Sequence, residues 1–115
     1  MPDRPTAVFA ATDLYAKCVY RAASEAGLRI PDDLSVVGFS DDDFAQEMDP
    51  PLTTVRQPAY EIGRKAAELI LARSNGAIQL TEIQRVQLAV EFIVRQSTEK
   101  PAPARLPQER LETGV

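Results

Sequence analysis

A short apolar run that ends in glycine and a cluster of carboxylates constrains this chain more than any other feature. Residues 34–39 read Leu-Ser-Val-Val-Gly-Phe, and Asp41, Asp42 and Asp43 follow after a single serine. A strand that is apolar nearly throughout is typical of a parallel sheet covered on both faces. In open α/β sheets, ligands bind at the carboxyl edge of the strands, which is where these polar side chains would lie. The pattern therefore favours a small-molecule cleft over a catalytic centre.

The residues before this run predict an α/β fold that begins with a β-α-β unit. Residues 6–11 indicate a short buried strand, and residues 13–26 indicate a helix with one apolar face. Gly27 ends this helix, and Pro31 prevents its continuation. We expect the strand at 34–39 to run parallel to the first, with a right-handed crossover. The apolar face of the helix comprises Tyr15, Val19, Ala22, Ala23 and Ala26.

The second half of the chain predicts a short strand, a helix and a long strand. Residues 52–57 form an extended segment, and Pro58 suits the first position of a helix that reaches about residue 73. Apolar and polar residues alternate within 84–95, which indicates a single long strand. The stripe of the helix consists of Ile62, Ala66, Leu69, Ile70 and Arg73. The apolar face of the strand consists of Val86, Leu88, Val90, Phe92 and Val94.

Composition argues against several classes of function. The 115 residues suit one small domain, and the formal net charge of −4 leaves no basic stripe for binding phosphates. The chain has no histidine and one cysteine, which excludes a His-based triad and an internal disulfide and fits a reducing cytoplasm. No apolar run reaches about 18 residues, the length of a membrane span. We expect no cofactor and no metal site, because the acidic loop lacks the spacing and central glycine of a calcium loop.

Five sequence segments follow one another in a fixed order over residues 5–98. They are Pro5–Asp13, Ala26–Asp33, Ser35–Phe39, Pro51–Pro58 and Val94–Thr98. Together they resemble the LacI/GalR family of bacterial transcriptional regulators. Any one segment is weak evidence, but five in order leave little room for chance.

The resemblance implies a parallel-sheet, three-layer α/β fragment of a two-lobed core like that of periplasmic binding proteins. In the family a small molecule, often a sugar, binds between the lobes and changes the affinity of the dimer for operator DNA. Residues 5–57 and 90–98 would belong to the C-terminal lobe, and residues 58–89 to the N-terminal lobe. The helix-turn-helix, the hinge and most of the N-terminal lobe would be missing from this chain. Residues 99–115 are expected to form a disordered tail.

The resemblance also implies the effector-binding residues. Thr12 stands where relatives commonly have a ligand-contacting Asn, although it also suits a helix cap, and Asp13 suits a structural role in the first turn. Ser40 stands where relatives usually have an Asp that accepts two sugar hydroxyls, which a neutral serine cannot do in that way. Either the effector differs, or Asp41 reaches in. Gln57 occupies a cleft position where its amide can face the ligand or bridge the backbone.

The dimer face that the resemblance implies lies on the first helix and on the acidic loop. Phe44 and Met48, if exposed in this loop, would suit the core of an interface. Packing of these two side chains against their own domain would explain them as well. The expected interface residues are Lys17, Tyr20, Phe44 and Met48.

Two functions from different classes follow. The first is a non-enzymatic regulatory module that binds an effector and forms a homodimer, with operator DNA bound only through the missing N-terminal domain. The second is a fragment of a solute-binding protein for transport, which shares the two-lobed core; the Leu-Thr-Thr-Val-Arg-Gln-Pro run at 52–58 favours the regulator. An enzyme is a distant third, because the chain lacks a nucleophile motif and a phosphate loop. We expect the chain alone not to bind DNA specifically, and to be marginally stable or to associate.

Overall fold

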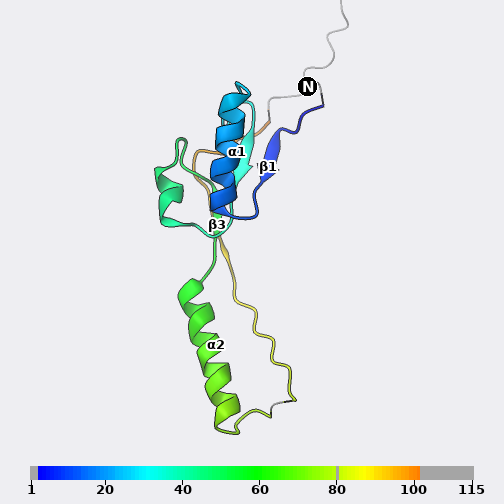
Figure 1. The fold of residues 1–115 in the computed structure, drawn as a ribbon, viewed down its shortest axis with the longest axis vertical. Coiled ribbons are helices and arrows are strands. Elements are labelled where there is room, and N and C mark those ends of the chain that lie inside the picture. The colour runs from blue at the N-terminus through cyan, green and yellow to red at the C-terminus, as the bar shows by residue number, and fades with distance from the viewer. Residues whose placement is uncertain (1–2, 80, 102–115) are drawn as a thin grey trace, which may run out of the picture.

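The chain folds into an α/β body and a helical arm that meet at a narrow waist (Figure 1). The computed structural model describes residues 3–79 and 81–101. The body comprises residues 3–57 and 91–101, and the arm comprises residues 58–90. In chain order the elements are β1 (Ala7–Phe9), α1 (Asp13–Glu25), β2 (Ser35–Val37), the 3-10 helix η1 (Asp43–Glu47), β3 (Thr54–Arg56), α2 (Ala59–Ser74) and β4 (Glu91–Ile93).

β1, α1 and β2 form the predicted β-α-β unit, which confirms the α/β class. β1 and β2 pair in parallel, with Val8 opposite Val36. The hydroxyl oxygen of Thr12 accepts a hydrogen bond from the Tyr15 backbone N–H at 3.2 Å and so caps α1. Gly27 follows the helix with a φ of 73°, a left-handed conformation that favours glycine. Both strands span three residues and are shorter than predicted.

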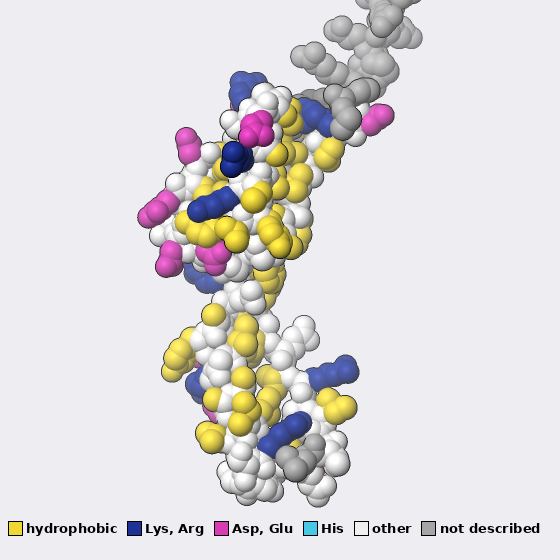
Figure 2. Space-filling view, in the orientation of Figure 1, with side chains coloured by type: hydrophobic (Ala, Val, Ile, Leu, Met, Phe, Trp, Pro, Cys, Tyr) yellow, Lys and Arg dark blue, Asp and Glu magenta, His cyan; other side chains and the backbone are white. Residues whose placement is uncertain are grey.

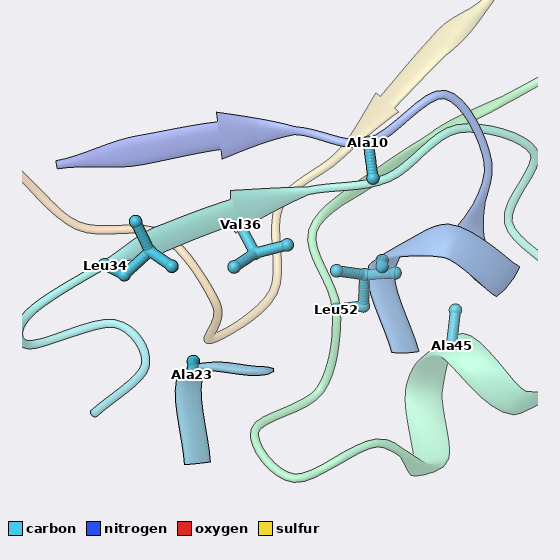
Figure 3. Close-up of a cluster of buried hydrophobic side chains, with 7 residues drawn as sticks. Ala10, Ala23, Leu34, Val36, Ala45 and Leu52 are labelled. Atoms are coloured by element: carbon cyan, nitrogen blue, oxygen red, sulfur yellow. The ribbon is translucent and has the colours of Figure 1, made fainter. Parts of the chain in front are cut away.

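The core of the body lies between α1, η1 and the sheet (Figure 3). The side chains of Val36 and Leu52 are fully buried there. Alanines on the two helices let them approach the sheet closely, and interiors of this kind pack without large voids. The alanines of this core are Ala10, Ala16, Ala23 and Ala45.

The predicted apolar face of α1 is wrong in part. Tyr15, Ala22 and Ala26 are exposed, whereas the buried residues of α1 are Asp13, Ala16 and Ala23. The cause is a polar residue at the start of the helix. The buried carboxylate of Asp13 is hydrogen-bonded inside the body. The face of α1 that carries Asp13, Ala16 and Ala23 therefore points toward the sheet.

The far side of β2 pairs with the chain that enters the waist. The Gly38 N–H donates to the Thr53 carbonyl at 2.9 Å, and the Ser40 N–H donates to the Val55 carbonyl at 2.8 Å. β3 in turn pairs antiparallel with β4, with Val55 opposite Phe92. Backbone hydrogen bonds therefore connect the body to both strands that lead into the arm.

The described residues of the arm, 58–79 and 81–90, include no buried side chain. α2 runs over sixteen residues without a buried side chain, and Ile62 and Ile70 are 44% and 65% exposed. Hydrophobic side chains accordingly lie on the surface of the arm (Figure 2). Residues 83–90, the segment that returns from α2 to the body, face α2 across an open groove of about 510 Å³. The apolar residues that line this groove include Ile62, Ala66, Leu69, Val86, Leu88 and Val90.

The single long strand predicted within 84–95 is wrong, because only Glu91–Ile93 forms a strand. Within the described chain, residues 83–90 make no backbone–backbone hydrogen bond. β3 ends at Arg56, so no neighbouring strand lies beside them. The alternating pattern indicates a segment that is suited to pairing in a β-sheet but has no neighbouring strand within the described chain.

The described residues contain neither a membrane-spanning helix nor a cluster of metal-binding side chains. Neither α1 nor α2 is long and apolar enough to cross a membrane. No group of three or more His, Cys, Asp or Glu side chains within 3–79 and 81–101 is placed to hold a metal ion. The predicted tail falls outside the described residues from position 102 onward, and the assignment of the body and the arm to two lobes stays a prediction.

Candidate functional site

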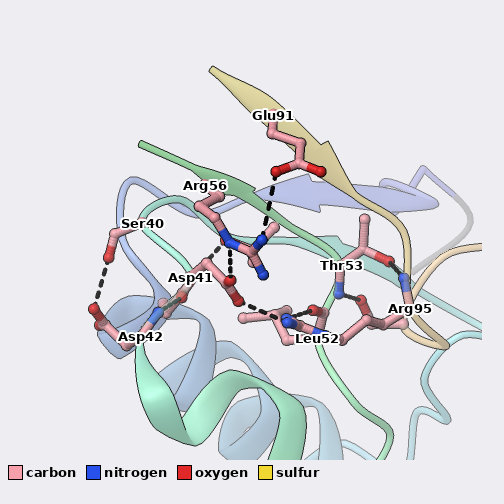
Figure 4. Close-up of polar contacts among 11 residues, drawn as sticks. Ser40, Asp41, Asp42, Leu52, Thr53, Arg56, Glu91 and Arg95 are labelled. Atoms are coloured by element: carbon pink, nitrogen blue, oxygen red, sulfur yellow. Dashed lines mark hydrogen bonds and ion pairs between the residues drawn. The ribbon is translucent and has the colours of Figure 1, made fainter. Parts of the chain in front are cut away.

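The predicted site residues gather where β2 ends, at the edge of the body that faces the waist. Ser40 and Asp41 have φ angles of 119° and 57°, which turn the chain sharply away from the strand. The Ser40 hydroxyl donates to the Asp42 carboxylate at 2.8 Å. Ser40 also lies beside Arg56 in a short parallel bridge, so the ends of two extended segments meet here (Figure 4). This is the carboxyl edge at which α/β sheets bind ligands.

Asp41 joins the acidic loop to both strands of the waist. Its two carboxylate oxygens accept hydrogen bonds from Arg56 Nε at 2.8 Å and from Arg95 Nη2 at 2.7 Å (Figure 4). Arg56 also pairs with Glu91 at 3.4 Å. Burial of the Asp41 carboxyl raises its pKa, but the bonds from Arg95 and Arg56 outweigh burial and hold that pKa below its ordinary value. Asp41 is therefore a carboxylate whose acceptors are already engaged.

Arg95 extends the same connection into the body. Its Nη1 donates to the Leu52 carbonyl at 2.9 Å, and its backbone N–H donates to the Thr53 hydroxyl at 2.9 Å. Sequence analysis did not identify Arg56 or Arg95 as site residues. A signal was present, since Arg56 lies within the recognised 52–58 run and Arg95 within the segment at 94–98. What the sequence does not show is that both arginines meet one carboxylate.

Asp13 lies in the interior of the body, next to the site, and binds the loop that carries the site residues. Its side chain is fully buried and accepts hydrogen bonds from the Thr54 hydroxyl at 2.6 Å and from the Asp42 N–H at 2.7 Å. Gly38 passes so close that a Cβ at this position would meet the Asp13 carboxylate and the Leu52 side chain. Asp13 thus holds the loop after β2 in place. Contact of Asp13 with an effector stays a prediction, and so does contact of Thr12, whose cap is formed.

Gln57 lies one residue beyond β3, on the side of the waist that opens into the arm. Its side chain is half-buried and lines the groove together with Pro58 and Ile62. The structure gives Gln57 no side-chain hydrogen bond within the described chain. Its amide therefore has donors and an acceptor to offer a ligand, and the contact with an effector stays a prediction.

The predicted interface residues make contacts within their own chain. Lys17 Nζ lies 3.9 Å from the centroid of the Phe44 ring, a cation–π contact. The Tyr20 hydroxyl donates to the Pro50 carbonyl at 2.7 Å, and burial is the main cause that raises its pKa to about 12. Met48 packs against the core. Phe44 and Met48 are both half-buried, and their part in a dimer stays a prediction.

Comparisons with known proteins place the chain in a family. The model of the periplasmic binding protein-like domain matches residues 1–98. The lactose operon repressor of Rhizobium radiobacter is 44% identical over 99 residues, which cover 86% of this chain and 85% of that protein. The chain belongs to the LacI/GalR family of transcriptional regulators.

Two further LacI/GalR relatives define the extent of the likeness. The HTH-type transcriptional repressor CytR of Escherichia coli is 47% identical over 76 residues, which cover 66% of this chain and 22% of CytR. The lac repressor dimer bound to operator and the anti-inducer ONPF superimposes with a TM-score of 0.72 at 35% identity, over 82% of this chain and 32% of that one. The chain thus spans about a fifth of the length of CytR. These relatives are repressors, which favours the regulator over the transport protein.

Proposed function

We propose that this chain is part of the effector-binding region of a LacI-type regulator. It binds a small-molecule effector, a sugar or a related metabolite, and contributes to a homodimer through Lys17, Tyr20, Phe44 and Met48. Operator binding resides in an N-terminal helix-turn-helix outside these residues. The protein acts in the cytoplasm and is not an enzyme.

One observation carries this proposal: the polar edge of the sheet sits at the junction of the body and the arm. Ser40 and Asp41 lie at the end of β2, and Gln57 lies at the end of β3, where the chain leaves for α2. A ligand bound among them would touch both parts of the molecule. If the arm can take two positions relative to the body, such a ligand would favour one of them. It shifts the equilibrium between the two positions by the difference in its affinity for them.

The chemistry of the edge suits a neutral, hydroxyl-rich ligand. The Gln57 amide can donate and accept hydrogen bonds, and the Ser40 hydroxyl, whose hydrogen is donated to Asp42, can accept one. The carboxylate of Asp41 is engaged by Arg56 and Arg95 and is neutralised by them. We expect Asp41 to position the loop that carries Ser40, and Ser40 and Gln57 to contact the effector.

The test is a chimera in which residues 5–98 replace the matching segment of the lac repressor. Operator binding without effector shows that the chimera folds, and a panel of mono- and disaccharides identifies compounds that release it. Gln57→Leu should weaken effector binding by about 1–3 kcal/mol, because a buried hydrogen-bonding group is left unpaired. Gln46→Leu on exposed η1 is the matched control and should leave the affinity unchanged. Unchanged effector affinity in both Ser40→Ala and Gln57→Leu would remove these residues from the site.

A further inference from the structure

Ser40 has a backbone conformation that its own local sequence does not favour. Its φ angle of 119° lies outside the regions that L-residues normally occupy, and Asp41 follows with a φ of 57° in the left-handed region. Such conformations cost free energy and persist only where the surrounding structure holds them. The turn at 40–41 carries the hydroxyl that is proposed to meet the effector. Whatever holds this turn therefore also places that hydroxyl.

Backbone hydrogen bonds hold the residues on either side of Asp41, but not Asp41 itself. The Ser40 N–H donates to the Val55 carbonyl at 2.8 Å, and the Asp42 N–H donates to the Asp13 carboxylate at 2.7 Å. The backbone N–H of Asp41 makes no hydrogen bond within the described chain. The middle of the turn is therefore held through the Asp41 carboxylate.

Of the two arginines that bond this carboxylate, Arg95 is the stronger support. The side chains of Arg95 and Asp41 are 15% and 9% exposed, whereas that of Arg56 is 51% exposed. An ion pair that is shielded from water is stronger than an exposed one. Arg95 is also fixed by a second contact, since its Nη1 donates to the Leu52 carbonyl at 2.9 Å. Arg56 instead divides its guanidinium between Asp41 and the exposed Glu91.

We propose that Arg95 is a positioning residue for effector binding. It does not contact the effector, but its ion pair with Asp41 keeps Ser40 in the strained conformation that places the hydroxyl at the sheet edge. Without Arg95 the turn relaxes toward ordinary φ angles, and the hydroxyl moves out of place. The inference rests on the proposed function and adds to it a residue that lies beyond β4, far from Ser40 in the sequence.

The test compares single and double variants of the lac repressor chimera, with the saccharide of the panel that releases it from operator. Ser40→Ala should weaken binding of that saccharide about fivefold, as the loss of one hydrogen bond does, and Arg95→Gln should weaken it at least as much. In the Arg95→Gln background, Ser40→Ala should cost less than about twofold, because residue 40 is already out of place. Gln57→Leu should keep its full cost in that background, because β3 places Gln57 independently.

A crystal structure of the Arg95→Gln chimera is a second measurement, which does not depend on the effector. Residue 40 should there have a negative φ. Arg64→Gln is the matched control, since Arg64 is 50% exposed and also pairs with two carboxylates, both on its own helix. It should change neither the saccharide affinity nor the φ of residue 40. Asp41→Asn removes the same ion pair from the other side and should hide the cost of Ser40→Ala in the same way.

Three results would overturn the inference and leave the proposed function intact. They are costs of Arg95→Gln and Ser40→Ala that add, a φ near 119° retained at residue 40 in Arg95→Gln, and equal losses of affinity in Arg95→Gln and Arg64→Gln. Loss of operator binding in both Arg95→Gln and Asp41→Asn would overturn it too, because the ion pair would then be needed for the whole fold. A panel without a releasing saccharide, or an unchanged affinity in Ser40→Ala, would contradict the proposed role of Ser40 and this inference with it.

Discussion

The helix of the body, α1, packs part of its surface against a sheet, whereas the helix of the arm, α2, has no sheet beside it. α1 and α2 are both amphipathic, but α1 buries Ala16 and Ala23 against a sheet, whereas α2 buries no side chain at all. Their difference is topological, because β1 and β2 lie beside α1 and only one extended segment lies beside α2. The spacing of apolar residues therefore predicts which face of a helix is suited to burial. Whether burial occurs depends on what else the chain brings to that face.

The largest expected difference between the two regions concerns apolar truncation. Leu52→Ala removes a fully buried side chain from the body and should lower the free energy of unfolding by about 3 kcal/mol, within the usual range for a core leucine. Ile70→Ala, at a residue that is 65% exposed, should change it by less than about 0.5 kcal/mol. Urea denaturation followed by far-UV circular dichroism measures both. Similar losses for the two variants would show that the arm has a core of its own in solution.

The second comparison concerns a carboxylate in the first turn of each helix. Asp13→Ala should cost about 2 kcal/mol, because the Thr54 hydroxyl and the Asp42 N–H lose a buried, charged acceptor. Glu61→Ala in α2 removes only exposed contacts with Arg64, and we expect a loss of about 0.5 kcal/mol or less.

The same urea titration compares the variants of this pair, with Asp13→Asn as the control that keeps the size of the side chain. If the two alanine variants lose equal stability, Asp13 acts only as a favourable charge at a helix start.

The third comparison concerns pH at the waist. The folded-state pKa of Asp41 lies below its ordinary value of 3.8, so its ion pairs contribute stability above that pH and lose it as the pH falls through the folded-state pKa. Asp41→Asn should therefore cost about 1 kcal/mol at pH 7 and progressively less below about pH 4. Asparagine is a suitable replacement because it tolerates the left-handed conformation at this position.

Stability measured at several pH values, for the wild type and for Asp41→Asn, tests this dependence. A cost that stays constant down to pH 3 would assign the effect to something other than the ionised pair.

The β-α-β unit and the cap on α1 could be predicted because local signals determine them. Thr12 and Gly27 mark the ends of a helix by backbone chemistry that does not depend on distant residues. The site could be predicted in part, since the end of a strand at 34–39 locates Ser40 and Asp41 at the sheet edge. The contacts of Asp41 could not, because they depend on Arg95, which lies 54 residues away along the chain.

The two errors have a common physical cause. The long strand within 84–95 was predicted from alternation, but a strand exists only where another backbone accepts its hydrogen bonds, and β3 offers three residues. The face of α1 was predicted from apolar spacing, but the hydrogen bonds of the buried Asp13 determine how the helix is turned. In both cases a distant polar partner, absent from the local pattern, decides the outcome.

The last comparison concerns one glycine that follows α1 and one that lies inside α2, and it separates backbone strain from packing. A Cβ at Gly27 or at Gly63 would meet no atom within 4 Å apart from those of the adjacent residues and of the helix's own backbone. Gly27 has a φ of 73°, so Gly27→Ala should lose about 1 kcal/mol of stability through the left-handed conformation alone. Gly63 lies inside α2, where alanine is a better helix former, so Gly63→Ala should favour the helix by about 0.5–1 kcal/mol.

The two glycine variants should also differ in where the effect is seen. Gly27→Ala should shift the urea transition of the body. Because α2 shares no core with the body, Gly63→Ala should slow hydrogen exchange of the α2 amides and leave that transition unchanged. A shift of the main transition by Gly63→Ala would mean that the arm and the body unfold as one cooperative unit, which the absence of buried residues on α2 argues against.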